Sequence, residues 1–184
     1  MFAIIGLGNP GEKYQQNRHN VGFMFVNYLV NELTGSRVNE FRFDKYSHSQ
    51  FVNTLMENKK LLLVKPQTFM NRSGEAVKKI IQNWKLKIGN IVVAHDDLDI
   101  PLGKFKIQKG TGPQLHNGLE SVEQYLKTSD FWRIRIGVDH RTPDNWPDGE
   151  TYVLQNFLKD ELVTMKNLFP TITNHPLFAG FLTG

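Results

Sequence analysis

The chain contains no cysteine among its 184 residues. This absence excludes disulfide bonds, zinc sites built from thiolates and a cysteine nucleophile. The chain also has no apolar run long enough to cross a bilayer, and its N-terminus lacks a basic segment followed by an apolar stretch. We therefore expect a cytoplasmic protein that does not associate with membranes.

The composition that remains is that of a globular domain. Hydrophobic residues make up 40% of the chain and charged residues 22%, which is ordinary for a folded protein. The length suits one domain with a sizeable core. Lysine and arginine exceed aspartate and glutamate by 22 − 18 = 4. This surplus favours a polyanionic partner, although an ordinary basic surface explains it equally well.

Hydrophobic periodicity predicts alternating strands and helices. The predicted strands are residues 2–7, 41–56, 60–65, 91–94, 104–107 and 132–138. The predicted helices are residues 21–33, stopped by Gly35, a second from an N-cap at Ser73 to about Gly89, and two more at 117–126 and 159–169. This order predicts a three-layer α/β/α sandwich around a mixed, twisted sheet, as a single domain over residues 1–184.

The segment GLGNPG, residues 6–11, matches the GxGxxG pattern of dinucleotide-binding folds. In those folds an apolar helix follows the glycines, and an acidic residue ends the second strand about 20 positions later. Here the polar segment EKYQQNRHN follows, and Glu32 falls inside a predicted helix. The match is therefore accidental. The glycines instead allow a sharp turn that brings Asn9 close to whatever binds above the first strand.

Polar and aromatic side chains gather after the predicted strands, where ligands bind in open α/β sheets. They are Asn9, Tyr14, His19, Phe69, Met70, Asn71, His95, Asp96, Asp97, Asp99, His116 and Asn117. Taken singly, most have an ordinary explanation as a turn or helix cap, and HDDLD also fits a site for a hard cation. Together they supply a histidine, an aspartate and several amides, which is the material for acid–base chemistry.

The segment GLGNPGEKYQQNRHNVG resembles the N-terminal signature of the bacterial-type peptidyl-tRNA hydrolase family, roughly GLGNPGxxYxxTRHNxG. The resemblance continues in order through KPQTFMNRSGEAV, VAHDDLDIPLGKFKI, HNGLESV and FWRIRIGV, and it covers most of residues 1–157. It implies an enzyme that hydrolyses the ester bond of peptidyl-tRNA, releasing the peptide and recycling free tRNA. It also implies a monomer that needs no cofactor and no metal and that binds the acceptor stem and CCA end of tRNA.

The resemblance also implies roles for individual residues. His19 matches the catalytic base, Asp96 the carboxylate that orients it, and Asn9 the amide beside the scissile bond. The implied substrate contacts are Tyr14, Phe69, Asn71 and Asn117, and the implied ligands of the tRNA 5′ phosphate are Lys104, Lys106 and Arg135. Asp97 and Asp99 are interpreted as turn and structural residues. Lys104 and Lys106 share one face of a strand, as do Arg133 and Arg135.

Two departures from the family pattern affect the site. Asn17 stands where the family pattern TRHN has threonine, and PQLHNG replaces GGHNG with an apparent extra residue. The loop loses two glycines and gains Pro113, which stiffens it. The alternative from another enzyme class is a nucleotide-binding protein built on GxGxxG, and the non-enzymatic alternative is a relative that binds RNA without hydrolysing it. The presence of His19, Asp96 and Asn9 favours the enzyme.

Overall fold

The computed structural model describes residues 1–34 and 41–183. Its strands form one seven-stranded mixed sheet in the order β2-β3-β4-β1-β5-β7-β6. The strands are β1 (Phe2–Gly6), β2 (Arg42–Asp44), β3 (Ser49–Met56), β4 (Lys59–Pro66), β5 (Ile91–Pro101), β6 (Phe105–Lys109) and β7 (Trp132–Asp139). The central strands β4, β1, β5 and β7 are mutually parallel. Their carboxyl ends therefore share one edge of the sheet.

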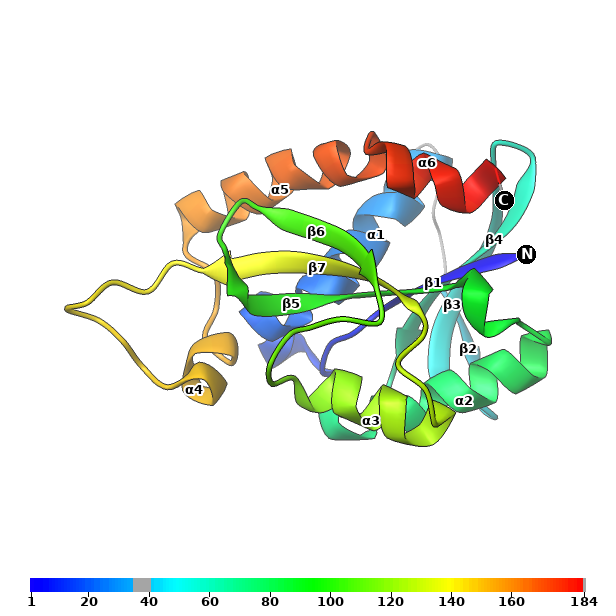
Figure 1. Cartoon of the computed structure of the whole chain (residues 1–184), viewed down its shortest axis with the longest axis horizontal. Coiled ribbons are helices and arrows are strands. Elements are labelled where there is room, and N and C mark those ends of the chain that lie inside the picture. The colour runs from blue at the N-terminus through cyan, green and yellow to red at the C-terminus, as the bar shows by residue number, and fades with distance from the viewer. Residues whose placement is uncertain (35–40, 184) are drawn as a thin grey trace.

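Helices cover both faces of this sheet (Figure 1). Helices α1 (Val21–Thr34), α5 (Lys159–Thr173) and α6 (Pro176–Thr183) pack on one face, while α2 (Ser73–Trp84) and α3 (Asn117–Leu126) pack on the other. A short helix, α4 (Gly149–Val153), follows the long loop after β7. The three-layer α/β/α sandwich predicted from the sequence is confirmed.

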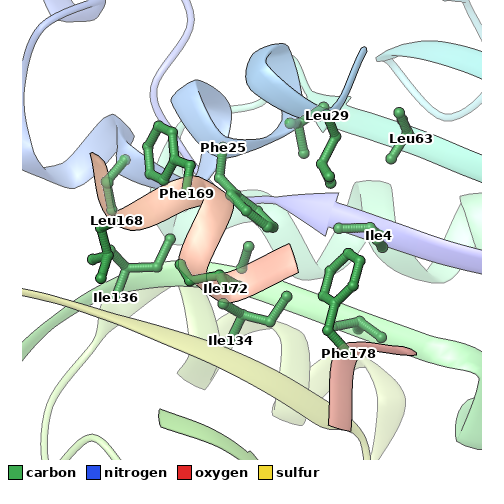
Figure 2. Packing of buried hydrophobic residues seen from close by; sticks show 14 of the residues in the cluster. Ile4, Phe25, Leu29, Leu63, Ile134, Ile136, Leu168, Phe169, Ile172 and Phe178 are labelled. Atoms are coloured by element: carbon green, nitrogen blue, oxygen red, sulfur yellow. The ribbon is translucent and has the colours of Figure 1, made fainter. Parts of the chain in front are cut away.

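Successive side chains along the buried strands point to opposite faces of the sheet and so contribute to both hydrophobic clusters. In β1, Ala3 and Ile5 join the cluster under α2 and α3, while Ile4 joins the cluster under α1, α5 and α6. Figure 2 shows this second cluster, where Phe25 of α1 packs edge-on against Phe169 of α5 with 5.5 Å between ring centroids. The sequence of a strand that is buried on both faces is a continuous apolar run, because side chains on each face pack into a hydrophobic core.

Two glycines let α1 lie unusually close to the sheet. A Cβ atom on Gly6 would stand 2.2 Å from the carbonyl oxygen of Gly22, and one on Gly22 would stand 2.3 Å from that of Ala94. No side chain fits at either position. The helix start therefore rests directly on the carboxyl end of β1 and on β5 at Ala94, and the residues just before α1 are held over the end of β1.

Two strand boundaries differ from the prediction. Residues 41–56 form two strands, because the Asp44 carboxylate accepts hydrogen bonds from the backbone N–H groups of Tyr46 and Ser47 and closes a turn. The strand predicted at 91–94 continues to Pro101 as β5, because it pairs with β7 through HDDLDIP. The turn between β3 and β4 is formed by Glu57 and Asn58, both of which have positive φ.

The helix boundaries also need correction. Ser73 is the first residue of α2 and not its cap. Its buried hydroxyl has no hydrogen-bond partner among the described residues, while the hydroxyl of Ser121 accepts from the Gly74 N–H. The helix ends at Trp84, before Gly89. Gly35, the predicted stop of α1, lies outside the described residues. Helices α4 and α6 were not predicted.

In the described part of the chain, no helix combines the length and the apolar character that a membrane span requires.

Candidate active site

A cavity of about 540 Å³ opens at the carboxyl edge of the parallel strands. Nine residues that the sequence analysis singled out line it together: Asn9, Tyr14, His19, Phe69, Met70, Asn71, Asp96, His116 and Asn117. They come from segments after β1 and β4, from β5 itself, and from the start of α3. The predicted tRNA ligands Lys104, Lys106 and Arg135 are not part of this lining.

The Asp96 carboxylate joins two histidines at the floor of the cavity. Its Oδ1 lies 2.8 Å from Nδ1 of His19 and 2.9 Å from Nε2 of His116. All three residues are buried. The imidazole rings of His19 and His116 are tilted by 42°, with centroids 5.0 Å apart. One oxygen of one carboxylate therefore sets the orientation of both rings.

The hydrogen bonds of His116 fix which ring atoms carry protons. Its Nδ1 accepts from the backbone N–H groups of Gly118 and Leu119 at the start of α3. The proton of the neutral ring is therefore on Nε2, which donates to Asp96. His19 likewise donates from Nδ1 to Asp96, so its Nε2 is the unprotonated atom, in a residue that lines the cavity. An unprotonated imidazole nitrogen is suited to accept a proton.

Burial and nearby negative charge have opposite effects on the pKa of His19. Burial lowers the pKa of its imidazole, but the charge of Asp96, the hydrogen bond to Asp96 and the charge of Glu150 together outweigh it, so the pKa is raised above 6.5. For Asp96, burial raises the pKa, yet the charges and hydrogen bonds of His19 and His116 lower it far below its ordinary value. Asp96 is therefore a carboxylate in the folded protein.

Asn9 is held so that its amide N–H₂ group is available. Its Oδ1 accepts from the Met70 backbone N–H at 2.8 Å. Its own backbone N–H and C=O are both bound by the Asn20 side chain at 2.9 Å. With the oxygen occupied, the Nδ2 group of Asn9 is the part left to donate a hydrogen bond in the cavity.

The residue before His19 is anchored by a buried ion pair. The Arg18 guanidinium lies 2.7 Å from the Glu161 carboxylate of α5, and both side chains are at most 5% exposed. The guanidinium also stacks over the Tyr152 ring at 4.1 Å, and the other Glu161 oxygen lies 3.1 Å from Nδ1 of His140. The turn that carries His19 is therefore tied to α5 and to the loop after β7.

An aromatic wall, defined here as Tyr14 and Phe69 with the amides Asn9 and Asn71, forms one side of the cavity. The rings of Tyr14 and Phe69 meet edge to face, with centroids 6.4 Å apart. Phe69 is 55% exposed. The Lys13 ammonium lies over the Tyr14 ring, 4.8 Å from its centroid, so the exposed ring of Phe69 is the one better suited to stacking against a nucleobase.

The basic residues are arranged differently from the expectation. Lys104 and Lys106 are exposed, but Arg133 and Arg135 are buried and not solvated charges. Nε of Arg135 donates to the Asp97 carboxylate at 2.6 Å, and Arg133 donates to the Glu123 carboxylate at 2.6 Å. Asp97 is thus a structural ion-pair partner. Spacing alone did not reveal these partners, because Asp97 and Glu123 lie on other elements.

Several residues of the site received no role from sequence reasoning. His116 was noticed beside Asn117 but was not assigned to the catalytic group. Leu98, Leu115 and Glu150, together with Val153 and Leu154 near α4, also line the cavity. The signal for His116 was present, since it directly precedes a predicted helix start. The residues around α4 had no signal, because that helix is only five residues long.

The atoms of His19, Asp96 and His116 also lie close enough to hold a metal ion, within 4.8 Å of one another. Two imidazoles and a carboxylate are a common donor set for zinc. However, the hydrogen bonds described above place a proton on each histidine nitrogen that faces Asp96, so these atoms are donors and not free ligands.

Three comparisons place the chain among known proteins. A family model described as "Peptidyl-tRNA hydrolase" matches residues 3–177. The chain is 43% identical over 169 residues to the peptidyl-tRNA hydrolase of Lawsonia intracellularis, covering 92% of this chain and 82% of that protein. It is 40% identical over 174 residues to that of Aliarcobacter butzleri, covering 95% and 89%. The crystal structure of peptidyl-tRNA hydrolase from Acinetobacter baumannii superimposes with a TM-score of 0.82 at 31% identity, covering 92% of this chain and 83% of that one.

Proposed function

The chain belongs to the peptidyl-tRNA hydrolase family, and on that premise we propose that it hydrolyses the ester bond of peptidyl-tRNA with His19 as the general base. The observation that carries the proposal is the bond from Nδ1 of His19 to Asp96, which leaves Nε2 as a base in a residue that lines the cavity. The reaction releases the peptide and free tRNA.

The proton transfers follow from this arrangement. Nε2 of His19 takes a proton from water as the water oxygen attacks the ester carbonyl carbon. Asp96 stabilises the imidazolium that forms, as the buried carboxylate of a catalytic triad does. The bond between the carbonyl carbon and the ribose oxygen then breaks, and the imidazolium returns its proton to that oxygen. The histidine ends in its starting state.

Asn9 is proposed to stabilise the negative charge that develops on the carbonyl oxygen. Its Nδ2 group is the free donor described above, and its position is fixed by Met70 and Asn20. A preorganised donor of this kind contributes about 2.7–4 kcal/mol to transition-state stabilisation. Because Asn9 is held from both ends, little reorganisation accompanies the reaction.

The remaining amides are proposed to form hydrogen bonds with the peptide. The aromatic rings are proposed to bind the terminal adenosine of the tRNA. Asn71 and Asn117 both line the cavity. Amides that pair with a peptide N–H or C=O disfavour an aminoacyl-tRNA, whose charged amine would leave them mispaired. Tyr14 and Phe69 present flat faces for stacking of a base.

The tRNA phosphate contact is proposed to involve Lys104, Lys106 and Arg135. Lys106 pairs directly with Arg135 across β6 and β7, and Arg135 pairs with His95, the neighbour of Asp96. The exposed lysine therefore lies in the sheet row next to the catalytic carboxylate. Arg135 is already paired with Asp97, so its replacement is a poor test of phosphate binding.

Lys106→Ala is expected to raise KM several-fold and leave kcat unchanged, because the contact is the same in the ground and transition states. The slope of log affinity against log salt is expected to flatten by about 0.7–0.9, the share of one phosphate. Lys60→Ala, an exposed lysine at the amino end of β4, is the matched control. Loss of kcat on a short N-acetyl-aminoacyl nucleotide would contradict the phosphate role.

The activity itself is tested with N-acetyl-aminoacyl-tRNA in the presence of EDTA. We expect release of the N-acetylated amino acid at the same rate with and without the chelator, because the histidine protons occupy the positions that a metal would need. Unblocked aminoacyl-tRNA is the comparison substrate and is expected to be cleaved far more slowly. No release from the blocked substrate would contradict the proposed function, and a rate lost with EDTA would contradict metal independence.

A further inference from the structure

Leu115 is an exposed leucine at the mouth of the catalytic cavity. It is 84% exposed, although it lines the same cavity as His19 and Asp96. It belongs to PQLHNG, the segment that departs from the family pattern by an apparent extra residue. When a ligand covers an aliphatic side chain that is otherwise exposed to water, the burial of its apolar surface favours binding.

The loop on both sides of Leu115 is anchored. The backbone N–H of Gln114 donates to the Asp99 carboxylate at 3.0 Å, and His116 donates to Asp96. Arg133 donates to the carbonyl oxygen of Gly112. A Cβ on Gly112 would stand 2.5 Å from the Arg135 guanidinium, so the backbone rests directly on that group. Leu115 is therefore held at the cavity mouth by fixed neighbours.

Besides its aromatic wall, the cavity has an aliphatic wall. We define the aliphatic wall as Leu98, Leu115, Val153 and Leu154, all of which line the cavity. In the strand order β4-β1-β5-β7-β6, the aromatic wall follows β4 and β1, whereas the aliphatic wall belongs to β5 and to the segments after β6 and β7. Along the sheet edge, the strands that lead into the aromatic wall are therefore β4 and β1, and those that lead into the aliphatic wall are β5, β7 and β6.

The two walls suit two different parts of the substrate. A planar adenine stacks well on the rings of Tyr14 and Phe69. Branched aliphatic side chains offer no flat face but bury aliphatic or aromatic side chains well. The substrate has such a group on the other side of the ester, namely the side chain of the amino acid joined to the tRNA.

We propose that Leu115, with Leu98 and Leu154, binds the side chain of the esterified amino acid and makes the enzyme favour apolar residues at that position. The inference rests on the proposed function and adds to it a preference among peptidyl groups. Leu115 acts as a specificity-determining residue through burial against the substrate. Covering one such side chain changes kcat/KM by about tenfold to a hundredfold.

The test uses one tRNA charged in turn with N-acetylated leucine, phenylalanine, glycine or aspartate. For the wild-type protein, kcat/KM is expected to be at least tenfold higher for leucine and phenylalanine than for glycine and aspartate. Leu115→Ser is expected to lose most of that preference, mainly through a higher KM for the apolar substrates, with the glycine substrate unaffected. Leu55→Ser, a 58% exposed leucine on β3, is the matched control and is expected to retain the preference.

The outcomes separate this inference from the function on which it rests. Equal kcat/KM for all four substrates, or a preference that survives in Leu115→Ser, overturns the inference while hydrolysis itself stands. A uniform loss of kcat on all four substrates in Leu115→Ser also overturns it, because the loop would then act only through His116. If the wild-type protein cleaves none of the four, the proposed function fails and the inference fails with it.

Discussion

His19→Ala is expected to reduce kcat for N-acetyl-aminoacyl-tRNA by about 10²- to 10⁴-fold, the usual contribution of a positioned general base. The substitution removes Nε2, the atom that accepts the proton from water. KM and tRNA affinity are expected to change little, because no other substrate contact is removed. His116 still donates to Asp96 in this variant, so the buried carboxylate keeps a partner.

The measurement is single-turnover hydrolysis together with tRNA binding and thermal unfolding. A variant that retains more than about a tenth of the wild-type rate would rule out the base role of His19. A variant that has lost tRNA binding or cooperative unfolding would instead show that His19 supports the fold of the site.

Asp96→Asn is expected to lower kcat by about 10²- to 10⁴-fold and to change the pH profile as well. The wild-type rate should fall with decreasing pH through a pKa above 6.5, because protonated His19 is not a base and Asp96 raises its pKa. Asparagine keeps the shape but not the charge. In the pH profile of the variant's remaining activity, the fall in rate at acidic pH should therefore occur at a lower pH than in the wild-type protein.

Asp97→Asn provides the contrast, because Asp97 holds Arg135 and does not line the cavity. Breaking a buried ion pair costs about 3–5 kcal/mol of unfolding free energy. For Asp97→Asn we therefore expect a marked fall in Tm and a smaller change in kcat than for Asp96→Asn. The pH at which the rate falls on the acidic side should stay the same as in the wild-type protein. Similar pH profiles and similar losses of kcat in the two variants would contradict the assignment of Asp96 as the orienting carboxylate.

The sequence predicted the layers of the fold because each layer has a local signature. Ile4 and its neighbours in β1 read as a strand buried on both faces, and the helical spacing of apolar residues marked α1, α2, α3 and α5. Polar residues after strands also indicated the cavity, since parallel strands bring their carboxyl ends to one edge.

The corrections share a physical cause, which is a partner far away in the chain. The sequence did not indicate that Arg135 is buried and paired with Asp97, because Asp97 lies on the neighbouring strand β5 and not close by in the chain. Ser73 looked like a cap because the competing hydroxyl, Ser121, comes from another helix. The sequence analysis assigned the glycines of GLGNPG to a sharp turn, and the contacts of Gly6 with Gly22 show in addition that α1 packs closely on the sheet there.

The ion pair between Arg18 and Glu161 links two residues 143 positions apart in the chain. During synthesis from the N-terminus, the segment that carries His19 leaves the ribosome long before α5 does. Until Glu161 arrives, the Arg18 guanidinium has no buried carboxylate to meet, and an unpaired charge is costly to bury. The turn around His19 can therefore adopt its final conformation only after α5 has packed against the sheet. The enzyme therefore becomes active only after α5 has been synthesised.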